Sequence, residues 1–152
     1  MSSLDPRENA PPRPADPGAV VAVEQDVYTF DIDFAGVVSN LVYMRWSEIW
    51  RLAWLGGAGL SIGALAAAGV VPFVVRQELN FRRPLRLGER VRLEGWLERI
   101  GESSVTLWLE MREAKGGELC CDNRQVIATA DARTGKSTPI PAALRAKLGA
   151  VP

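Results

Sequence analysis

The residue types for acyl-transfer chemistry are concentrated in the segment Asp31–Asn40. Asp33 supplies a carboxylate just before an expected helix, and Gly36 lets the backbone turn and approach a ligand closely. Ser39 and Asn40 are natural helix N-caps, so the first amide N–H groups of that helix are expected to be free and to point outward. A carboxylate facing a helix start can attack a carbonyl, or direct water at it, while the amides hold the carbonyl oxygen. The alternative is plain helix capping.

The protein has no histidine among its 152 residues. This excludes Ser-His-Asp and Cys-His nucleophiles and every histidine-ligated zinc site, and two cysteines cannot build a Cys₄ site. An enzyme with this sequence must therefore use a carboxylate, a lysine, a tyrosine or a thiolate as its base. The 18 basic and 18 acidic side chains balance, which argues against nucleic acid as a partner.

The two cysteines, Cys120 and Cys121, are neighbours in an expected strand, where adjacent side chains point to opposite faces. We therefore expect two reduced thiols, a cytoplasmic protein and no metal site.

A long amphipathic helix is expected directly after Asn40. Trp46, Trp50 and Trp54 recur every four residues and form a wide apolar ridge suited to being covered by a sheet. Polar residues fall on the opposite face: Arg45, Ser47, Glu48 and Arg51.

Strands are expected in the sequence both before and after this helix. One runs from Val21 to Asp31, and after Pro84 the hydrophobic pattern has period two, with turns at Gly101 and Gly116. Trp96 and Trp108 fall on the more polar, outer register. The last strand covers about residues 119–132, and residues 139–149 form a short terminal helix. One helix on one largely antiparallel sheet is an α+β domain, and its edge strands favour dimerisation.

The stretch Trp54–Val75 carries no charge and is long enough to span a bilayer. Six helix-breaking residues divide it, which favours a soluble protein: Gly56, Gly57, Gly59, Gly63, Gly69 and Pro72. Ser61 is an expected N-cap of a short helix, residues 62–68, followed by a strand from Val70 to Phe81. Residues 1–19, with five prolines, are expected to be a disordered tail, and residues 20–152 a single domain.

Two motifs in register resemble the 4-hydroxybenzoyl-CoA thioesterase family of hotdog-fold acyl-CoA thioesterases. The first combines Asp33, Gly36, Val38, Asn40 and Tyr43 with the later Trp46, Glu48 and Arg51. The second is residues 80–89, where an aromatic residue and Arg-Pro precede a glycine and an acid. The resemblance covers about residues 22–134.

The resemblance implies a hotdog fold, a curved antiparallel sheet wrapped around one long central helix. It also implies subunits joined edge to edge, as a homodimer or homotetramer, with active sites between them. Asp33 corresponds to the family's nucleophile or general base, and the amide near Asn40 to its oxyanion donor. Other branches of the family place the carboxylate on the helix, which makes Glu48 a second candidate. Glu48 and Arg51 can instead form a plain helix ion pair.

By analogy, the arginines around Pro84, which are Arg82, Arg83 and Arg86, hold the phosphates of coenzyme A. Further expected substrate contacts are Gly36, Val37, Val38, Tyr43, Phe73 and Pro84. The expected activity is hydrolysis of an acyl-CoA or of an acyl group on carrier protein, with coenzyme A present only as part of substrate or product. The absence of histidine argues against the hotdog dehydratases. The alternative is a non-catalytic hotdog module that binds acyl-CoA, acyl chains or a protein partner.

Overall fold

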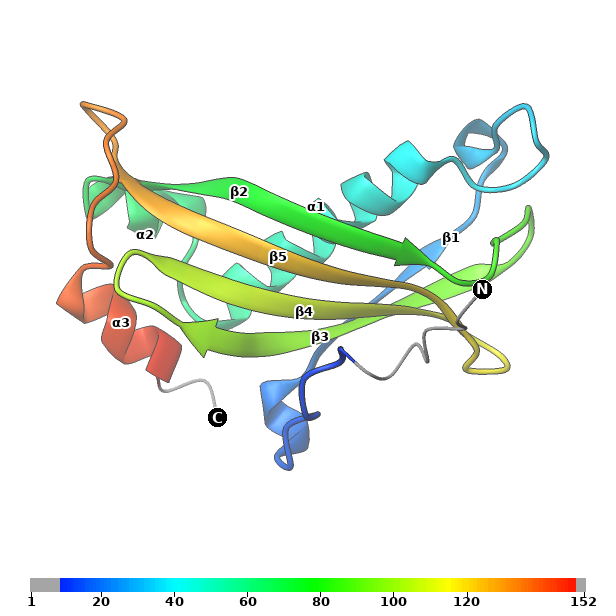
Figure 1. The fold of residues 1–152 in the computed structure, drawn as a ribbon, viewed down its shortest axis with the longest axis horizontal. Coiled ribbons are helices and arrows are strands. Elements are labelled where there is room, and N and C mark those ends of the chain that lie inside the picture. Colours follow the sequence, from blue (N-terminus) through cyan, green and yellow to red (C-terminus); the bar gives the residue numbers. More distant parts are fainter. Residues whose placement is uncertain (1–8, 150–152) are drawn as a thin grey trace.

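The structure is a computed structural model that describes residues 9–149. Five strands form one antiparallel sheet in the order β1-β3-β4-β5-β2, and helix α1 lies along one face of it (Figure 1). The expected α+β architecture, a curved antiparallel sheet around one long helix, is confirmed. The elements are β1 Val21–Asp26, α1 Asn40–Gly57, α2 Ile62–Ala67, β2 Val70–Phe81, β3 Arg90–Ile100, β4 Ser104–Glu113, β5 Leu119–Asp131 and α3 Ala142–Gly149.

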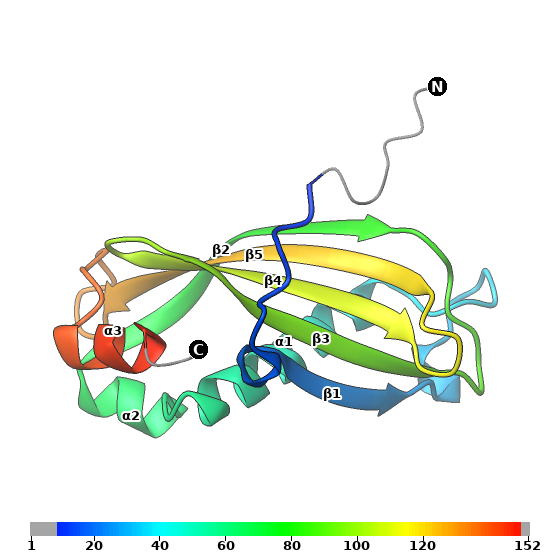
Figure 2. The ribbon, with the colours of Figure 1, turned by 90° about the horizontal axis from the view of Figure 1, so that it is seen from below.

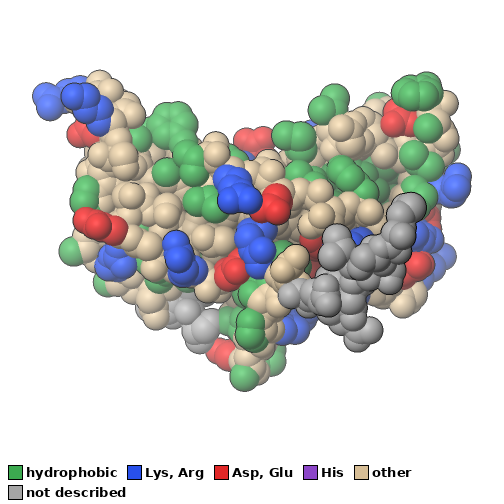
Figure 3. Space-filling view, viewed as in Figure 1, with side chains coloured by type: hydrophobic (Ala, Val, Ile, Leu, Met, Phe, Trp, Pro, Cys, Tyr) green, Lys and Arg blue, Asp and Glu red, His purple; other side chains and the backbone are tan. Residues whose placement is uncertain are grey.

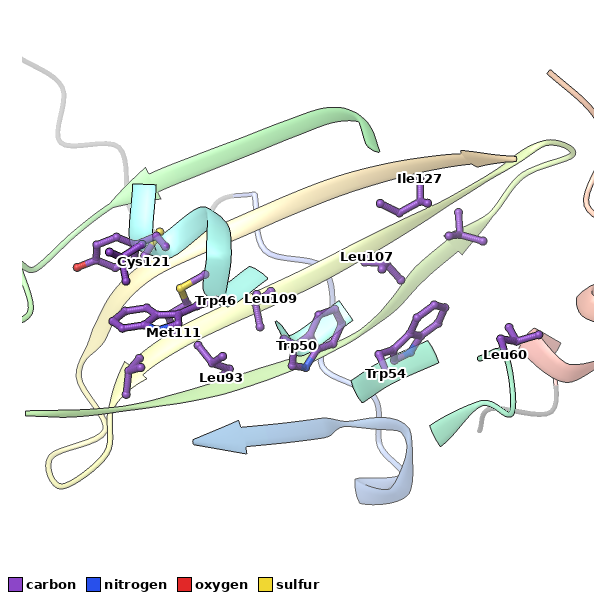
Figure 4. Packing of buried hydrophobic residues seen from close by; sticks show 14 of the residues in the cluster. Trp46, Trp50, Trp54, Leu60, Leu93, Leu107, Leu109, Met111, Cys121 and Ile127 are labelled. Carbon is purple, nitrogen blue, oxygen red and sulfur yellow. The ribbon is translucent and has the colours of Figure 1, made fainter. Parts of the chain in front are cut away.

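The tryptophan ridge of α1 forms the centre of the core. Trp46, Trp50 and Trp54 are at most 2% exposed, and they lie in a row along the inner face of the sheet (Figure 4). Strands β3, β4 and β5 supply the facing side chains, among them Leu93, Leu107, Leu109, Met111 and Ile127. This contact fixes the helix over the sheet, and with it the position of the loop that precedes the helix.

The uncharged stretch Trp54–Val75 is divided among the end of α1, all of α2 and the start of β2. The Ser61 hydroxyl accepts the N–H of Ala64 at 3.2 Å, and Gly69 ends the short helix with a φ of 73°. None of the helices in residues 9–149 is long and apolar enough to cross a membrane.

The first strand is shorter than the sequence predicts. β1 ends at Asp26, and Thr29–Asp31 form a turn of 3-10 helix. The turn forms because the Asp31 carboxylate accepts the backbone N–H of Tyr28 at 2.9 Å, which bends the chain away from the sheet.

Trp96 and Trp108 do lie on the outer face, opposite each other on β3 and β4, yet they are only 2% and 3% exposed. Arg13 covers Trp96, with its guanidinium 5.6 Å from the ring, and forms an ion pair with Glu94 at 2.8 Å. Arg124 covers Trp108 at 5.1 Å. Basic and acidic side chains alternate over this face (Figure 3).

Part of the predicted N-terminal tail crosses this outer face. Residues 1–8 lie outside the described residues. Residues 9–19 lie between the start of β1 and the face of the sheet that points away from α1 (Figure 2). The Asn9 carbonyl accepts Arg124 Nη2 at 2.7 Å, so the segment contacts β5 as well as β3. Ala19, at its end, is buried.

Candidate functional site

Asp33 lies in a tight turn between β1 and α1. Its backbone N–H donates to the Val37 carbonyl at 2.9 Å, and the Gly36 N–H donates back to the Asp33 carbonyl at 3.0 Å. Gly36 has a φ of 73°, which only glycine adopts without strain. The carboxylate Oδ1 accepts the N–H of Ala35 at 2.8 Å, which sets the direction of the side chain. Within residues 9–149, Oδ2 has no hydrogen-bond donor, so this oxygen can face a bound molecule.

A second carboxylate, Asp31, holds this turn against the helix. Asp31 is only 1% exposed, and its side chain forms an ion pair with Arg45 on α1. Its backbone carbonyl also accepts the N–H of Ser39 at 2.9 Å. Sequence reasoning missed this role, because Arg45 lies 14 positions further along the chain and no local pattern links the two.

Of the backbone amides of Val38, Ser39 and Asn40, which the sequence predicts to be free, the structure leaves one free. Ser39 is the N-cap, and its hydroxyl accepts the N–H of Leu41 at 3.4 Å. The Val38 N–H already donates to the Leu85 carbonyl at 2.9 Å, and the Ser39 N–H is taken by Asp31. Among the described residues the Asn40 N–H has no acceptor. The Asn40 amide, at the positive end of the helix dipole, is therefore the one among Val38, Ser39 and Asn40 that is left free for an acceptor on a bound molecule.

A pocket of about 410 Å³, the Asp33 pocket, brings both motifs together. It lies where the start of α1 meets the end of β2. The two sequence motifs contribute nearly all of its wall, which consists of Asp33, Val37, Val38, Asn40, Tyr43, Phe81, Arg82, Arg83 and Pro84. Gly36 forms the turn beside it, and Arg86 lies two residues beyond the wall. Phe81 is the one lining residue that was not predicted as a site residue, although it is the aromatic residue of the second motif.

Tyr43 closes the back of this pocket. It is 3% exposed, and its ring packs edge-on against Trp46 and Phe81, with ring centres 5.4 and 5.2 Å away. Its hydroxyl accepts the backbone N–H of Leu85 at 3.4 Å. Burial raises the pKa of Tyr43 to about 12, so the phenol stays protonated at neutral pH and acts as a hydrogen-bonding wall, not as a base.

Arg82 and Arg83, two of the predicted phosphate ligands, are held by carboxylates. Arg82 forms an ion pair with Asp122 at 3.0 Å, and Asp122 is 1% exposed. Arg83 binds both oxygens of Glu89, with the shorter distance at 2.6 Å. Within residues 9–149, the exposed side chain of Arg86 has no such carboxylate partner. Arg86 therefore has the guanidinium with the most donors left for a phosphate.

Two predicted site residues lie away from the Asp33 pocket. Phe73 is on the outer face of the sheet, half-exposed, paired with Ala128. Glu48 is exposed near the middle of α1, at the rim of a different pocket. The expected ion pair between Glu48 and Arg51 does not form, because Arg51 turns inward and donates to Gln125 Oε1. Burial lowers the pKa of Arg51.

This second pocket, the Trp54 pocket, has a volume of about 200 Å³ and lies near the other end of α1. Apolar side chains from α1, α2, α3 and the sheet form its inner wall, including Trp54, Leu65, Leu107, Ile127 and Leu144. Glu48 and Arg51 stand at its rim. No pattern in the sequence signalled this pocket, because its wall is assembled from five separate stretches of chain.

Residues 27–148 match the family described as the thioesterase-like superfamily. This chain belongs to the thioesterase-like superfamily. It is also similar to the putative acyl-CoA thioesterase YneP of Bacillus subtilis (strain 168), with 28% identity over 75 residues. That match spans 49% of this chain and about half, 54%, of YneP.

Solved structures of thioesterases share the architecture. Slr0204, a 1,4-dihydroxy-2-naphthoyl-CoA thioesterase from Synechocystis, superposes with a TM-score of 0.77 at 19% identity, covering 86% of this chain and 96% of the other. A thioesterase from Thermus thermophilus, crystallised with coenzyme A and zinc, has a TM-score of 0.72 at 26% identity, covering 86% and 92%. The superfamily protein described here therefore has the hotdog fold that its motifs imply.

Proposed function

We propose that this protein hydrolyses the thioester of an acyl-CoA, or of an acyl group on carrier protein, in the Asp33 pocket. The observation that carries the proposal is the meeting of the Asp33 carboxylate and the free Asn40 amide at one pocket whose wall continues into the Arg82–Pro84 segment. Membership in the thioesterase-like superfamily supports it, as does the coenzyme A bound in the Thermus thermophilus relative.

The proposed hydrolysis uses only groups that this chain contains. Asp33 removes a proton from water as the water oxygen attacks the thioester carbonyl carbon, and the carbonyl oxygen, now negative, accepts the Asn40 N–H. The carbon–sulfur bond then breaks, and coenzyme A leaves as a thiolate that takes up a proton. In the second version, Asp33 itself attacks the carbonyl carbon, and water hydrolyses the resulting anhydride. A thioester has a good leaving group, so a carboxylate suffices without histidine.

The arginine-rich turn after β2 is assigned to the phosphates of coenzyme A. Arg86 supplies the charge that is not already paired, while Arg82 and Arg83 shape the wall through their bonds to Asp122 and Glu89. Guanidinium groups match phosphate oxygens in geometry and charge.

We further propose that the protein acts as a homodimer or homotetramer. β2 is an edge strand of 12 residues, and its free edge can pair with the same strand of a second copy. A twofold axis makes such a contact self-complementary. Sedimentation or light scattering on the purified protein measures the assembly.

The decisive experiment is a panel of acyl-CoA thioesters, short, long and aromatic, with release of free thiol as the readout. Asp33→Asn removes the charge but keeps the Ala35 bond within reach, and it is expected to lower kcat by at least about a hundredfold. Thermal unfolding of the variant reports whether the fold is kept. An Asp33→Asn variant as fast as the wild type, or a wild type that cleaves none of the panel, leaves the alternative: a module that binds acyl-CoA without catalysis.

A further inference from the structure

Two carboxylates with little solvent exposure stand side by side on the outer face of the sheet. Glu94 of β3 lies directly opposite Glu110 of β4, and their side chains are 13% and 11% exposed. Like charges in this position of a sheet repel each other. A cation that lies between the two carboxylates removes the repulsion, and Arg13 of the N-terminal segment does so, 2.8 Å from Glu94 and 4.0 Å from Glu110.

The charges around this pair show that Arg13 supplies a cation that the strands themselves lack. Among the described residues, the ion pairs that include Glu94 and Glu110, or their partners, connect four carboxylates of β1, β3 and β4 with three arginines of β3 and β4. These are Glu24, Asp26, Glu94 and Glu110, with Arg90, Arg92 and Arg112. Arg13 is the fourth arginine, so the numbers of acidic and basic groups become equal only when the segment is docked.

Aromatic rings and a backbone hydrogen bond complete the contact. The Arg13 guanidinium lies 5.6 Å from the centre of the Trp96 ring, which favours a cation over the ring face. Trp108 lies opposite Trp96 on β4, and Arg124 covers it. Arg124 Nη2 also donates to the Asn9 carbonyl at 2.7 Å. Aromatic side chains together with donors for backbone carbonyls are the groups that bind proline-rich peptides.

The docked segment has the sequence of such a peptide. Three of the five residues 10–14 are prolines, and a proline restricts both its own backbone and that of the residue before it to extended conformations. A polyproline II helix has three residues per turn, so Pro11 and Pro14 fall on one side of it. Both are partly buried, whereas Pro12 between them is exposed. One side of the segment therefore packs on the protein.

We propose that the outer face of the sheet around Trp96 is a peptide-binding site for an arginine flanked by prolines, and that residues 9–14 are its tethered ligand. The tether is short, because the chain is fixed again at Asp16, whose side chain accepts the Gly18 N–H at 2.9 Å. Such a tether holds the ligand at an effective concentration in the millimolar range. The site is then closed to other peptides in the full chain, and it opens when the segment is removed or loses its arginine.

The first test supplies the ligand as a separate peptide. A shortened protein without residues 2–14 keeps the Asp16 turn and β1, and circular dichroism checks its fold. A fluorescent peptide of residues 9–15 is titrated with it, and anisotropy reports binding. We expect a Kd below about 1 mM, since a weaker site would not hold the segment at the effective concentration of its tether. The full chain should bind at least about tenfold more weakly, because its own segment must leave first.

Variants of the peptide show which groups are recognised. Arg13→Ala should weaken binding at least about tenfold, because it removes both the charge and the contact with the ring. Pro12→Ala is the matched control and should change the Kd less than about twofold, since Pro12 is exposed. A folded shortened protein that binds no peptide overturns the proposal, and so does equal affinity for the wild-type and Arg13→Ala peptides.

A second test uses the full chain and so does not depend on the shortened protein. Arg13→Ala in the full chain weakens the tethered ligand, and the wild-type peptide should then bind at least about threefold more tightly than it binds the wild-type chain. Adding Glu94→Gln should remove this gain, whereas Glu102→Gln, at the turn between β3 and β4, should keep it. Unchanged binding of the peptide on Arg13→Ala overturns the proposal.

Light scattering tests for a different occupant of the uncovered face. A shortened protein with the same mass per assembly as the full chain, or with a larger mass that the peptide reverses, supports the peptide site. A larger mass that the peptide leaves unchanged means that a second copy covers the face, and it overturns the proposal. Neither measurement depends on thioester hydrolysis.

Discussion

Gly95 of β3 lies directly under the ring of Trp50, and a Cβ at this position would approach the ring atom Cε2 to 2.8 Å. The backbone carbonyl of Trp108 on β4 blocks the other side. Trp50 is itself held in place, because its Nε1 donates to the Val21 carbonyl at 2.9 Å and the residue is fully buried. The absence of a side chain at Gly95 is therefore what allows α1 to lie this close to the sheet.

Gly95→Ala is expected to lower the free energy of unfolding by about 2–3 kcal/mol, because the added methyl group must displace Trp50 or the sheet. Urea unfolding followed by tryptophan fluorescence measures the loss. Gly56→Ala is the control: Gly56 is in α1 with no atom within 4 Å of an added Cβ, so this change should stabilise by up to about 1 kcal/mol. Equal stability of both variants would contradict the close approach.

Substitution of the two carboxylates in the loop before α1 should have different effects: at Asp31 on stability, and at Asp33 on activity. Asp31→Asn weakens the ion pair between the buried Asp31 carboxylate and the half-exposed Arg45, and it is expected to lower the free energy of unfolding by about 1–3 kcal/mol. Asp33→Asn should leave stability within about 0.5 kcal/mol but abolish turnover. Denaturant unfolding and thiol release, measured on both variants, give the comparison. A stable Asp31→Asn protein would show that the ion pair does not hold the turn.

Substitution of the arginines near the end of β2 should have different effects: at Arg86 on KM, and at Arg82 on stability. Arg86→Ala is expected to raise KM for acyl-CoA by about tenfold with little change in kcat, and the effect should shrink at high salt. Arg82→Ala should act on stability, by about 3 kcal/mol, because it leaves the buried Asp122 charge unpaired. If Arg86→Ala leaves KM unchanged for coenzyme A thioesters, the phosphates are bound elsewhere.

Acid should weaken the turn that carries Arg86. Hydrogen bonds from Arg83 lower the pKa of Glu89, and the Arg86 N–H adds to this effect. A depressed carboxyl pKa stabilises the fold above the unfolded-state pKa of about 4.3, and this stabilisation is lost as the pH falls through the lower, folded-state pKa. The stability difference between wild type and Glu89→Gln should therefore be about 1 kcal/mol at pH 7 and should shrink as the pH falls below about 4.3. A difference that stays constant with pH would exclude this linkage.

The two thiols should be inert in the folded protein. Cys120 and Cys121 are fully buried and unpaired with each other, as expected, and burial raises the pKa of Cys121 to about 12. Because the thiolate is the reactive form, a disulfide reagent at pH 8 should label no thiol within minutes and two per chain in denaturant. Rapid labelling of the native protein would mean that this end of β5 opens.

Periodic hydrophobicity made the core elements predictable. The four-residue spacing of Trp46, Trp50 and Trp54, together with polar residues at positions 45, 47, 48 and 51, fits one face of a helix. The period of two after Pro84 fits a strand whose side chains alternate between the two faces of a sheet. The outer register of Trp96 and Trp108 followed from the same rule, but the two arginines that cover them, Arg13 and Arg124, did not.

What could not be predicted depends on contacts between distant parts of the chain. The Val38 amide is occupied because Leu85, from another loop, lies within hydrogen-bonding distance. Phe73 points outward because β2 has a bulge between Val74 and Arg76. The bulge reverses the alternation, so Phe73 and Phe81, an even number of residues apart, face opposite sides of the sheet. No local pattern revealed where that extra residue is inserted.

The N-terminal segment that covers Trp96 also changes where this domain begins. The family match starts at residue 27, whereas described contacts with the sheet start at Asn9, which is 18 residues earlier. A recombinant protein begun at the family boundary would therefore lose β1 together with Arg13, and would uncover the indole ring of Trp96. Its emission spectrum would shift to longer wavelength, and its solubility would fall, for reasons unrelated to the active site.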